Sequence, residues 1–399
     1  MAADGQVAAH SRAVGSEAAG PAPALPGLAP GGGLQIGRRP LLCFSHLRWN
    51  FVYQRPQHLM VRFARSAPVF FLEEPVPADQ AAPSLALEET ADGVVVAVPR
   101  LPPDLDEAGA LAAQRLLLDR LCAAQGIVAP LLWYYTPMAL GFSDHLRPAL
   151  TVYDCMDELA AFRGAPAALQ AREEELLRRA DLVFTGGHSL YEAKRGRHPR
   201  VYAFPSGVDA AHFRQARAAL PEPADLKAIP RPRIGHYAVL DERLDTGLLA
   251  AVAEARPDWQ LVLIGPIAKI DPAALPRRPN LHYLGRKDYR ELPAYLAGWD
   301  VAMMPFALNA ATRFISPTKT PEYLAAGKPV VATPIADVIR SYGAGGLVRI
   351  AATPAEFVAA IEQSLRELPP SAAWLDRVDR LLDAMSWEAT WAGMRDLLG

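Results

Sequence analysis

Short apolar runs alternate with amphipathic helical patterns from Pro40 onward, and this alternation limits the folds that the chain can adopt. A first series of apolar runs starts with LLCFS and a second with RIGHYAVL. Apolar runs separated by helices are typical of βα units, whose strands pair in parallel. The sequence therefore predicts an α/β protein with two doubly wound, Rossmann-like domains. Helices are expected at Pro56–Arg65, Ala108–Gln125, Leu169–Arg179, Leu248–Ala255, Tyr289–Ala297, Pro317–Ala326 and Pro354–Leu368.

Changes in composition divide the chain into segments. Residues 1–37 are rich in Ala, Gly and Pro and lack the basic start and apolar core of a signal peptide, so we expect a disordered tail. The first domain is predicted over residues 38–214 and the second over residues 232–370. Residues 215–231, rich in proline, alanine and charged residues, are expected to form a linker. The whole of Asp209–Arg231 has the pattern of a hinge.

The segment 371–399 is predicted to form amphipathic helices that carry Trp374, Trp387 and Trp391. Such large apolar side chains need a surface to cover. We expect these helices to cross back and pack on the first domain.

Composition excludes several classes of protein. A net charge of −2 gives no overall attraction to nucleic acid, and no run of about 18 apolar residues predicts a membrane-spanning helix. The three cysteines, Cys43, Cys122 and Cys155, are widely spaced, which suggests neither a disulfide framework nor a zinc site. We expect a cytoplasmic protein, and peripheral contact with the inner face of the membrane remains compatible with the sequence.

The stretch Asp300–Pro334 has the pattern of a buried strand, a polar loop, a helix and a second buried strand. A helix that begins near Ser316, Pro317 and Thr318 would point backbone N–H groups and the positive end of its dipole at a phosphate. Lys319 lies in the first turn, and the Glu322 carboxylate could accept hydrogen bonds from two neighbouring hydroxyls, such as those of a ribose. The alternative is an ordinary capped helix in which both side chains are solvated.

Two facing doubly wound domains would bring the carboxyl ends of both sheets around one crevice. Ligands of open α/β sheets bind at these strand ends. The sequence therefore predicts a cleft between the domains as the active site.

Several runs in the second half carry a resemblance to a known family: WQLVLIGP, LHYLGRKDYRELPAYLAGWDVAMMPF and SPTKTPEYLAAGKPVVATP. Their order resembles the donor-nucleotide half of GT-B glycosyltransferases, especially those like glycosyltransferase family 4. The runs WNFVYQRPQHLMVRFA and VYDCMDEL resemble a bacterial branch associated with surface polysaccharides and teichuronic-acid-type polymers. The resemblance extends from Pro40 to the C-terminus.

The resemblance implies transfer of a sugar from a nucleotide-diphosphate donor to a glycan or lipid-linked saccharide acceptor. It also implies retention at the anomeric carbon, with no cofactor and no bound metal, because positive side chains and backbone amides take the place of the metal. Stabilisation of the charge on the leaving diphosphate is then the largest catalytic contribution, and no protein nucleophile is required.

Within the family's E-x7-E motif, Glu322 is similar to the second Glu, which holds the donor ribose. Phe314 stands at the position of the first Glu, so the usual contact to the donor sugar hydroxyls is missing. The nearby polar residues Asn309, Thr312 and Arg313 are the candidates to replace it.

For the family's Arg and Lys pair that holds the diphosphate, Arg243 occupies the matching region. Lys319, or else Lys269, would supply the second charge. Alternatively, Arg243 has no ligand and forms an exposed salt bridge with Asp241 or Asp245.

The resemblance also assigns Gly265 to the donor site and places the base against the backbone near Gly285, Arg286 and Lys287. A glycine at such a place is equally compatible with a simple turn.

In the first domain, the loop HLRWNFVYQRPQHL is expected to lie over the cleft, and it offers His46, Trp49, Arg55 and Gln57. Arg55 is the favoured catalytic candidate, because a buried packing role is the commoner one for Trp49 and His46.

A second group of candidates follows the run TVYDCM. One of Asp154, Asp157 and Glu158 could orient an acceptor hydroxyl or the transferred sugar, although helix capping explains Asp157 equally well. No histidine or third carboxylate lies at a spacing that supports a metal site there. His188 follows a strand and precedes a helix, so it could touch either substrate or simply lie in a turn.

Three other functions are compared with the sequence pattern by the features that each would require. A dehydrogenase would carry G-x-G-x-x-G between its first strand and helix, and that fingerprint is absent. A nucleotide-sugar epimerase of the same architecture would convert its donor without any acceptor. A non-catalytic GT-B partner protein is compatible with the missing first Glu.

Overall fold

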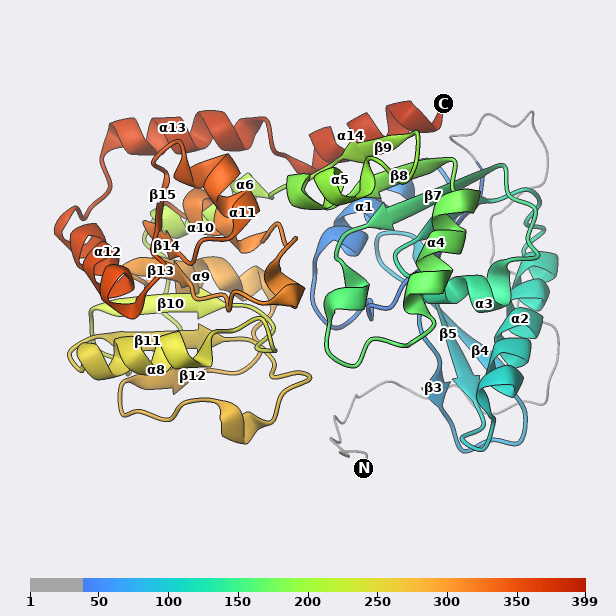
Figure 1. Cartoon of the computed structure of the whole chain (residues 1–399), viewed down its shortest axis with the longest axis horizontal. Helices are drawn as coiled ribbons and strands as arrows, with labels where there is room; N and C mark the ends of the chain where they lie inside the picture. Colours follow the sequence, from blue (N-terminus) through green and yellow to red (C-terminus); the bar gives the residue numbers. More distant parts are fainter. Residues whose placement is uncertain (1–38) are drawn as a thin grey trace.

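The computed structural model describes residues 39–399, so the tail expected over residues 1–37 lies outside the described residues. Two α/β domains, each built on its own sheet, lie next to each other (Figure 1). The fold class predicted from the sequence is confirmed. Within the described residues, none of the helices combines the length and apolarity that a bilayer crossing needs.

The first domain contains a nine-stranded sheet in the order β3-β5-β2-β1-β6-β7-β8-β9, with β4 paired to β5. All pairs are parallel except the β4–β5 hairpin. The sequence prediction missed this hairpin, because its outer strand is half exposed and lacks a continuous apolar run. The strands are β1 Leu41–Phe44, β2 Val69–Leu72, β3 Val76–Pro77, β4 Ser84–Glu89, β5 Val94–Leu101, β6 Leu131–Tyr134, β7 Leu150–Cys155, β8 Leu182–Thr185 and β9 Val201–Ala203.

Helices cover both faces of this sheet because successive side chains of each strand point to opposite faces. Along β1, Leu42 and Phe44 enter one buried cluster, whereas Leu41 and Cys43 enter the other. The helices are α1 Arg55–Phe63, α2 Glu107–Ala124, α3 Leu140–Ser143, α4 Leu169–Arg179 and α5 His188–Lys194, with 3-10 turns η2 Pro137–Ala139 and η3 Leu159–Ala161.

The second domain contains a six-stranded, fully parallel sheet in the order β12-β11-β10-β13-β14-β15. Its apolar runs are buried on both faces, as expected for parallel strands covered by helices. The strands are β10 Arg233–Tyr237, β11 Gln260–Ile264, β12 Leu281–Tyr283, β13 Val301–Met304, β14 Val330–Ala332 and β15 Val348–Ile350. Its helices are α8 Thr246–Ala255, α9 Leu292–Ala297, α10 Lys319–Ala325, α11 Ala336–Val338 and α12 Pro354–Arg366, with turns η5 Pro272–Ala274, η6 Tyr289–Glu291, η7 Ala310–Thr312 and η8 Ile339–Gly343.

Local sequence signals explain where several helices begin. In α12, Thr353 accepts a hydrogen bond from the backbone of Glu356, which reaches back to Thr353, and Pro354 fills the first helical position. This reciprocal capping satisfies N–H groups that a helix start otherwise leaves unpaired. Asp245 caps α8 by a single bond, because its side chain accepts from the backbone N–H of Leu248.

The connector between the domains is packed. It contains α6 Ala210–Arg214, turn η4 Gln215–Arg217 and α7 Ala224–Lys227. Ala216, Leu226 and Ile229 are buried in the core of the second domain. A segment that was expected to be a hinge therefore lies against that domain, because its apolar side chains find partners there.

Two terminal helices, α13 Ala372–Asp383 and α14 Trp387–Leu398, run across both domains (Figure 1). Helix α14 packs on the first domain, where Trp387 stacks on His58 with ring centroids 4.4 Å apart. Helix α13 instead packs on the second domain, and Trp374 lies against that core. The expectation that all three tryptophans reach the first domain is therefore wrong for Trp374.

We predict that Gly235→Ala destabilises the second domain. A methyl group at Gly235 in β10 would lie 1.9 Å from the Trp299 ring, so the core must shift at a cost of about 1–3 kcal/mol. Gly247→Ala in α8 is the matched control, because the nearest atom to the added carbon is 3.4 Å away. Urea denaturation should show a lower midpoint for the first variant only, and equal midpoints would contradict the packing argument.

Candidate active site

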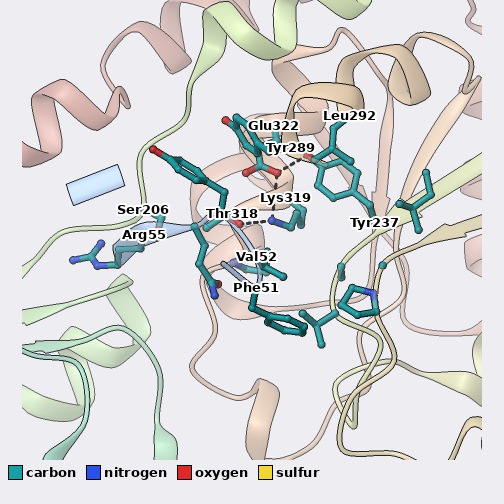
Figure 2. A pocket seen from close by; sticks show the side chains of 18 of the residues that line it. Phe51, Val52, Arg55, Ser206, Tyr237, Tyr289, Leu292, Thr318, Lys319 and Glu322 are labelled. Carbon is teal, nitrogen blue, oxygen red and sulfur yellow. Dashed lines mark hydrogen bonds and ion pairs between the residues drawn. The ribbon is translucent and has the colours of Figure 1, made fainter. Parts of the chain in front are cut away.

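A cavity of about 800 Å³ lies between the domains, at the carboxyl ends of the strands of both sheets. The cavity wall formed by the first domain consists of the loop of residues 49–55, together with Met156, Asp157, Gly186 and Ser206. The wall formed by the second domain consists of residues at or after the ends of β10, β11, β12 and β13, and of the start of α10. Figure 2 shows this arrangement, with Phe51, Val52, Arg55 and Ser206 opposite the second-domain side chains. The structure thus places a cleft where the sequence predicted one.

The second-domain wall is centred on Glu322, which is only 8% exposed. The hydroxyl of Tyr237 in β10 donates to Glu322 Oε2, and Lys319 Nζ lies 3.4 Å from the same oxygen (Figure 2). Lys319 Nζ also lies 3.0 Å from Thr318 Oγ1 and 5.3 Å from the centre of the Tyr237 ring. Neither side chain is solvated in the manner of an ordinary capped helix.

Helix α10 has seven residues, and Thr318 at its start has helical backbone angles and makes no side-chain capping bond. Ser316, Pro317, Thr318 and Lys319 all line the cleft. An anion there would therefore meet a lysine, a hydroxyl and the backbone of a short helix start.

Arg243 lines the cleft, and its side chain is 26% exposed. It makes a bidentate pair with Asp241, with Nη2–Oδ2 at 2.7 Å and Nε–Oδ1 at 2.9 Å. The salt bridge considered from the sequence is thus present, and it orients the guanidinium at the cleft edge. Lys269 is exposed and does not line the cleft, and its Nζ lies 5.3 Å from the centre of the Phe162 ring.

The loop residues after β11 and β12 form the far side of the same wall. Gly265 has a φ of 143°, and a Cβ there would lie 1.7 Å from the carbonyl oxygen of Ala238, so only glycine fits. Gly285 accepts a backbone hydrogen bond from Gly265, at 2.9 Å, and does not itself line the cleft. Arg286 donates to the Asn50 carbonyl at 3.1 Å, and Lys287 pairs with Asp225 at 2.6 Å.

The three residues considered as replacements for the family's first Glu do not line the cleft. Asn309 caps turn η7 and donates to the Glu242 carbonyl at 2.9 Å. Thr312 is 2% exposed, and the Arg313 guanidinium lies over the Phe314 ring. None of Asn309, Thr312 and Arg313 lines the cleft among the residues that the structure describes.

Arg55 and Asp154 form a buried pair in the first domain. Their side chains are 1% and 0% exposed, with Nη2–Oδ1 at 2.8 Å, and Arg55 also donates to the Phe204 carbonyl at 2.7 Å. Arg55 touches the cleft, but its charge is already paired, and Asp154 lies behind it. The geometry gives this pair a positioning role, because it ties the start of α1 to β7 and to the chain after β9.

Asp157 lines the cleft directly after β7. Burial raises the pKa of its carboxyl, and Asp241 adds to this, whereas Arg243 and Arg55 oppose it. His46 does not line the cleft; burial and Lys269 lower the pKa of its ring to about 4. His46 is therefore neutral at physiological pH.

The remaining first-domain candidates shape the site. Gln57 holds the cleft loop by donating to the carbonyls of Trp49, at 2.8 Å, and Val52, at 3.0 Å. Glu158 turns away from the cleft and pairs with Lys194 at 2.8 Å. His188 starts α5 beside the domain contact and does not line the cavity.

Sequence reasoning missed several residues of the cleft, including Asn50, Phe51, Tyr53, Ser206, Tyr237 and Tyr289. Tyr237 ends an apolar strand, and Tyr289 lies in a short turn, and aromatic residues at such places are usually core residues. Within residues 39–399, no group of three or more His, Cys, Asp and Glu side chains is arranged to hold a metal ion.

Comparison with known proteins identifies the second domain. Residues 235–367 match the family model described as Glycosyl transferases group 1. They form a glycosyl transferases group 1 domain. This domain carries Glu322, Lys319 and Arg243, which were assigned to the donor site by resemblance.

A curated relative is similar over part of its length. The putative teichuronic acid biosynthesis glycosyltransferase TuaH of Bacillus subtilis (strain 168) is 28% identical over 221 residues, which is 51% of this chain and 55% of that protein. The chain thus matches only about half the length of this relative.

Solved structures show the fold around the group 1 domain. Sucrose-phosphate synthase from Thermosynechococcus elongatus has a TM-score of 0.66 at 16% identity, covering 90% of this chain and 98% of its own. Anabaena HepE in complex with UDP and glucose scores 0.64 at 15% identity, with coverages of 90% and 98%. The catalytic domain of Starch Synthase IV from Arabidopsis thaliana bound to ADP and acarbose scores 0.65 at 11% identity, with coverages of 91% and 99%. The two-domain fold is the GT-B fold.

We predict that the protein loses stability as the pH falls from about 6.5 toward 4. Burial lowers the pKa of His46 and of His236, which lies behind the cleft, to about 4. The unfolded chain, in which histidine titrates near 6.5, therefore binds more protons within this window, and acid favours unfolding. Urea denaturation at pH 7 and pH 5 measures the effect. Equal midpoints at the two pH values, or histidine ring resonances that all titrate near 6.5, would contradict it.

Proposed function

We propose that this protein is a glycosyltransferase that moves a glycosyl group from a nucleoside-diphosphate sugar to a hydroxyl of a saccharide or lipid-linked saccharide. The supporting observation is the convergence of Glu322, Lys319 and Arg243 on one interdomain cleft of about 800 Å³. The name of the TuaH relative and the UDP and ADP in the titles of the structural neighbours support this chemistry.

In this proposal the second domain binds the donor. Lys319 and Arg243, together with the backbone at Ser316–Thr318, hold the diphosphate. Lys319 and Tyr237 both contact Oε2 of Glu322, which leaves Oε1 to accept from a ribose hydroxyl. Gly265, Arg286 and Lys287 border the region where the base lies. Charge grows on the diphosphate as the glycosidic C–O bond breaks, so the cations stabilise the transition state more than the bound donor.

The transfer retains the anomeric configuration and needs no metal. The acceptor hydroxyl attacks from the face that the diphosphate leaves, and the departing phosphate oxygen takes its proton. Asp157 orients the acceptor hydroxyl or the transferred sugar across the cleft. Arg55 and Asp154 position this wall, and neutral His46 supports the loop behind it.

In this proposal the reaction takes place on the cytoplasmic side of the membrane, and the protein contacts the membrane surface when the acceptor is lipid-linked. The three cysteines Cys43, Cys122 and Cys155 are free thiols, which suits a reducing compartment.

We predict that Lys319→Ala and Glu322→Ala each weaken binding of the nucleoside diphosphate by about 1–3 kcal/mol, the scale of a lost charged hydrogen bond. Calorimetric titration with UDP, ADP and GDP measures the affinity. Lys227→Ala, which removes an exposed lysine of α7 outside the cleft, is the matched control. Unchanged affinity in both cleft variants would refute the assignment of the donor site.

Turnover tests the rest of the proposal. We expect Asp157→Asn to lower kcat by at least about tenfold with little change in the dissociation constant of the nucleoside diphosphate, because Asp157 faces the acceptor side. Activity should persist in EDTA. Loss of activity in EDTA with recovery on addition of Mg²⁺ or Mn²⁺ would contradict metal independence.

The same assays separate the alternative functions. Conversion of the donor without an acceptor would identify an epimerase, and binding without turnover on any acceptor would identify a non-catalytic partner protein.

A further inference from the structure

The hydroxyl of Tyr289 is an unsatisfied donor in the cleft. Tyr289 lines the cavity, and its hydroxyl oxygen is buried without a hydrogen-bond partner among residues 39–399. A buried hydroxyl that lacks a partner carries a free-energy cost of about 1–3 kcal/mol. Such groups call for an explanation, and a ligand that supplies the missing partner is one.

The ring of Tyr289 is held firmly, so the hydroxyl has little freedom to turn toward solvent. It stacks on His212 with ring centroids 4.4 Å apart and planes 9° apart, and its backbone carbonyl lies 2.9 Å from His212 Nε2. The edge of Phe213 lies against it, with centroids 5.6 Å apart. The ring of Tyr53, on the first-domain wall, lies opposite, with its centroid 5.3 Å from the centroid of the Tyr289 ring. The hydroxyl is therefore preorganised in the position that the structure shows.

Glu322 is the charged side chain that acts most strongly on this hydroxyl. Burial raises the pKa of Tyr289, and the Glu322 carboxylate raises it further, so the phenol remains protonated as a donor. Figure 2 draws Tyr289 with Glu322, Lys319 and Thr318 on the second-domain wall. A phosphate is a poor partner for the Glu322 carboxylate itself, because the two negative charges repel. A neutral group with hydroxyls that both donate and accept suits the pair.

We propose that Tyr289 is a specificity-determining residue, and that its hydroxyl and Glu322 together bind the ribose diol of the donor nucleotide. One hydroxyl of the ribose diol donates to Glu322 Oε1, and the oxygen of the other hydroxyl accepts from the Tyr289 hydroxyl. This inference rests on the proposed function, since it requires a nucleotide in the cleft. A deoxyribose would leave both the Glu322 carboxylate and the Tyr289 hydroxyl without a partner. A site with two such unpaired polar groups rejects deoxyribose more strongly than a site with the carboxylate alone.

The test combines one variant with one change in the ligand. UDP, ADP and GDP are first screened by thermal shift, and the diphosphate that binds is then titrated calorimetrically beside its 2′,3′-dideoxy analogue. Tyr289→Phe should weaken binding of the ribonucleotide by about two- to tenfold, the range for one neutral hydrogen bond. It should leave binding of the dideoxy analogue unchanged, so the discrimination between the two ligands falls by the same factor.

Two controls keep the outcome decisive. Tyr283→Phe removes a hydroxyl that donates to the Pro276 carbonyl at 2.9 Å, outside the cleft, and should not change the discrimination. The ligand-free Tyr289→Phe protein should melt at the same temperature as the wild type or higher, because the variant removes only an unpaired hydroxyl.

A lower melting temperature would mean that the hydroxyl has a partner in the free protein and would overturn the premise. An equal effect of Tyr289→Phe on both ligands, or no effect on either, would overturn the inference while leaving the proposed function intact. Failure of every nucleoside diphosphate to bind the wild type would instead count against the proposed function itself.

Discussion

The contact between the first domain and the loop that carries Ser316 is the constraint on which the cleft depends. Asp337, at α11 of the second domain, accepts hydrogen bonds from the backbone and the hydroxyl of Ser189 at the start of α5. A Cβ on Gly187 would lie 2.3 Å from Asp337 Oδ2 and 2.6 Å from Ser316 Cβ. The loop that carries Ser316 is therefore pressed against the first domain, and a side chain at position 187 would push the two walls apart. Residues far apart in sequence line one cleft because the two domains approach so closely here.

Charge is distributed unequally between the two walls. In the first domain, Arg55 and Asp154 pair in the interior, and Lys194 is 2% exposed between Glu158 and Glu173. Removing one partner of such a buried pair is costly, so these charges serve mainly to hold the strand ends in place. In the second domain, Lys319 and Arg243 are partly exposed and face the cavity. Each of these two cations is paired with one carboxylate but keeps exposed surface toward the cavity, whereas the buried pairs of the first domain form a rigid frame opposite.

Sequence patterns predicted the frame better than the site. The helix expected at Leu169–Arg179 has those bounds, because its apolar positions recur with helical spacing and apolar runs flank it. The candidates Lys319 and Glu322 near α10 do line the cleft, and a lysine and a carboxylate one turn apart carry a local sequence signal. Asn309 was misplaced because turn η7 directs its side chain to the Glu242 carbonyl, a loop contact that no periodic pattern encodes. Tyr289 was missed because its role depends on what surrounds its hydroxyl, and only the folded chain determines that.

The replacement of the family's first Glu by Phe314 has a structural consequence of its own. Phe314 belongs to the second domain but packs against the buried cluster of the first, so it makes an apolar contact between the domains. Of the other carboxylates that line the cleft, Glu322 is engaged by Tyr237 and Lys319, and Asp288 and Glu291 cap turn η6 together. Asp157 stands on the opposite wall. In the proposed function, Asp157 is the carboxylate that orients the acceptor hydroxyl or the transferred sugar, so this contact depends directly on how closely the two domains approach.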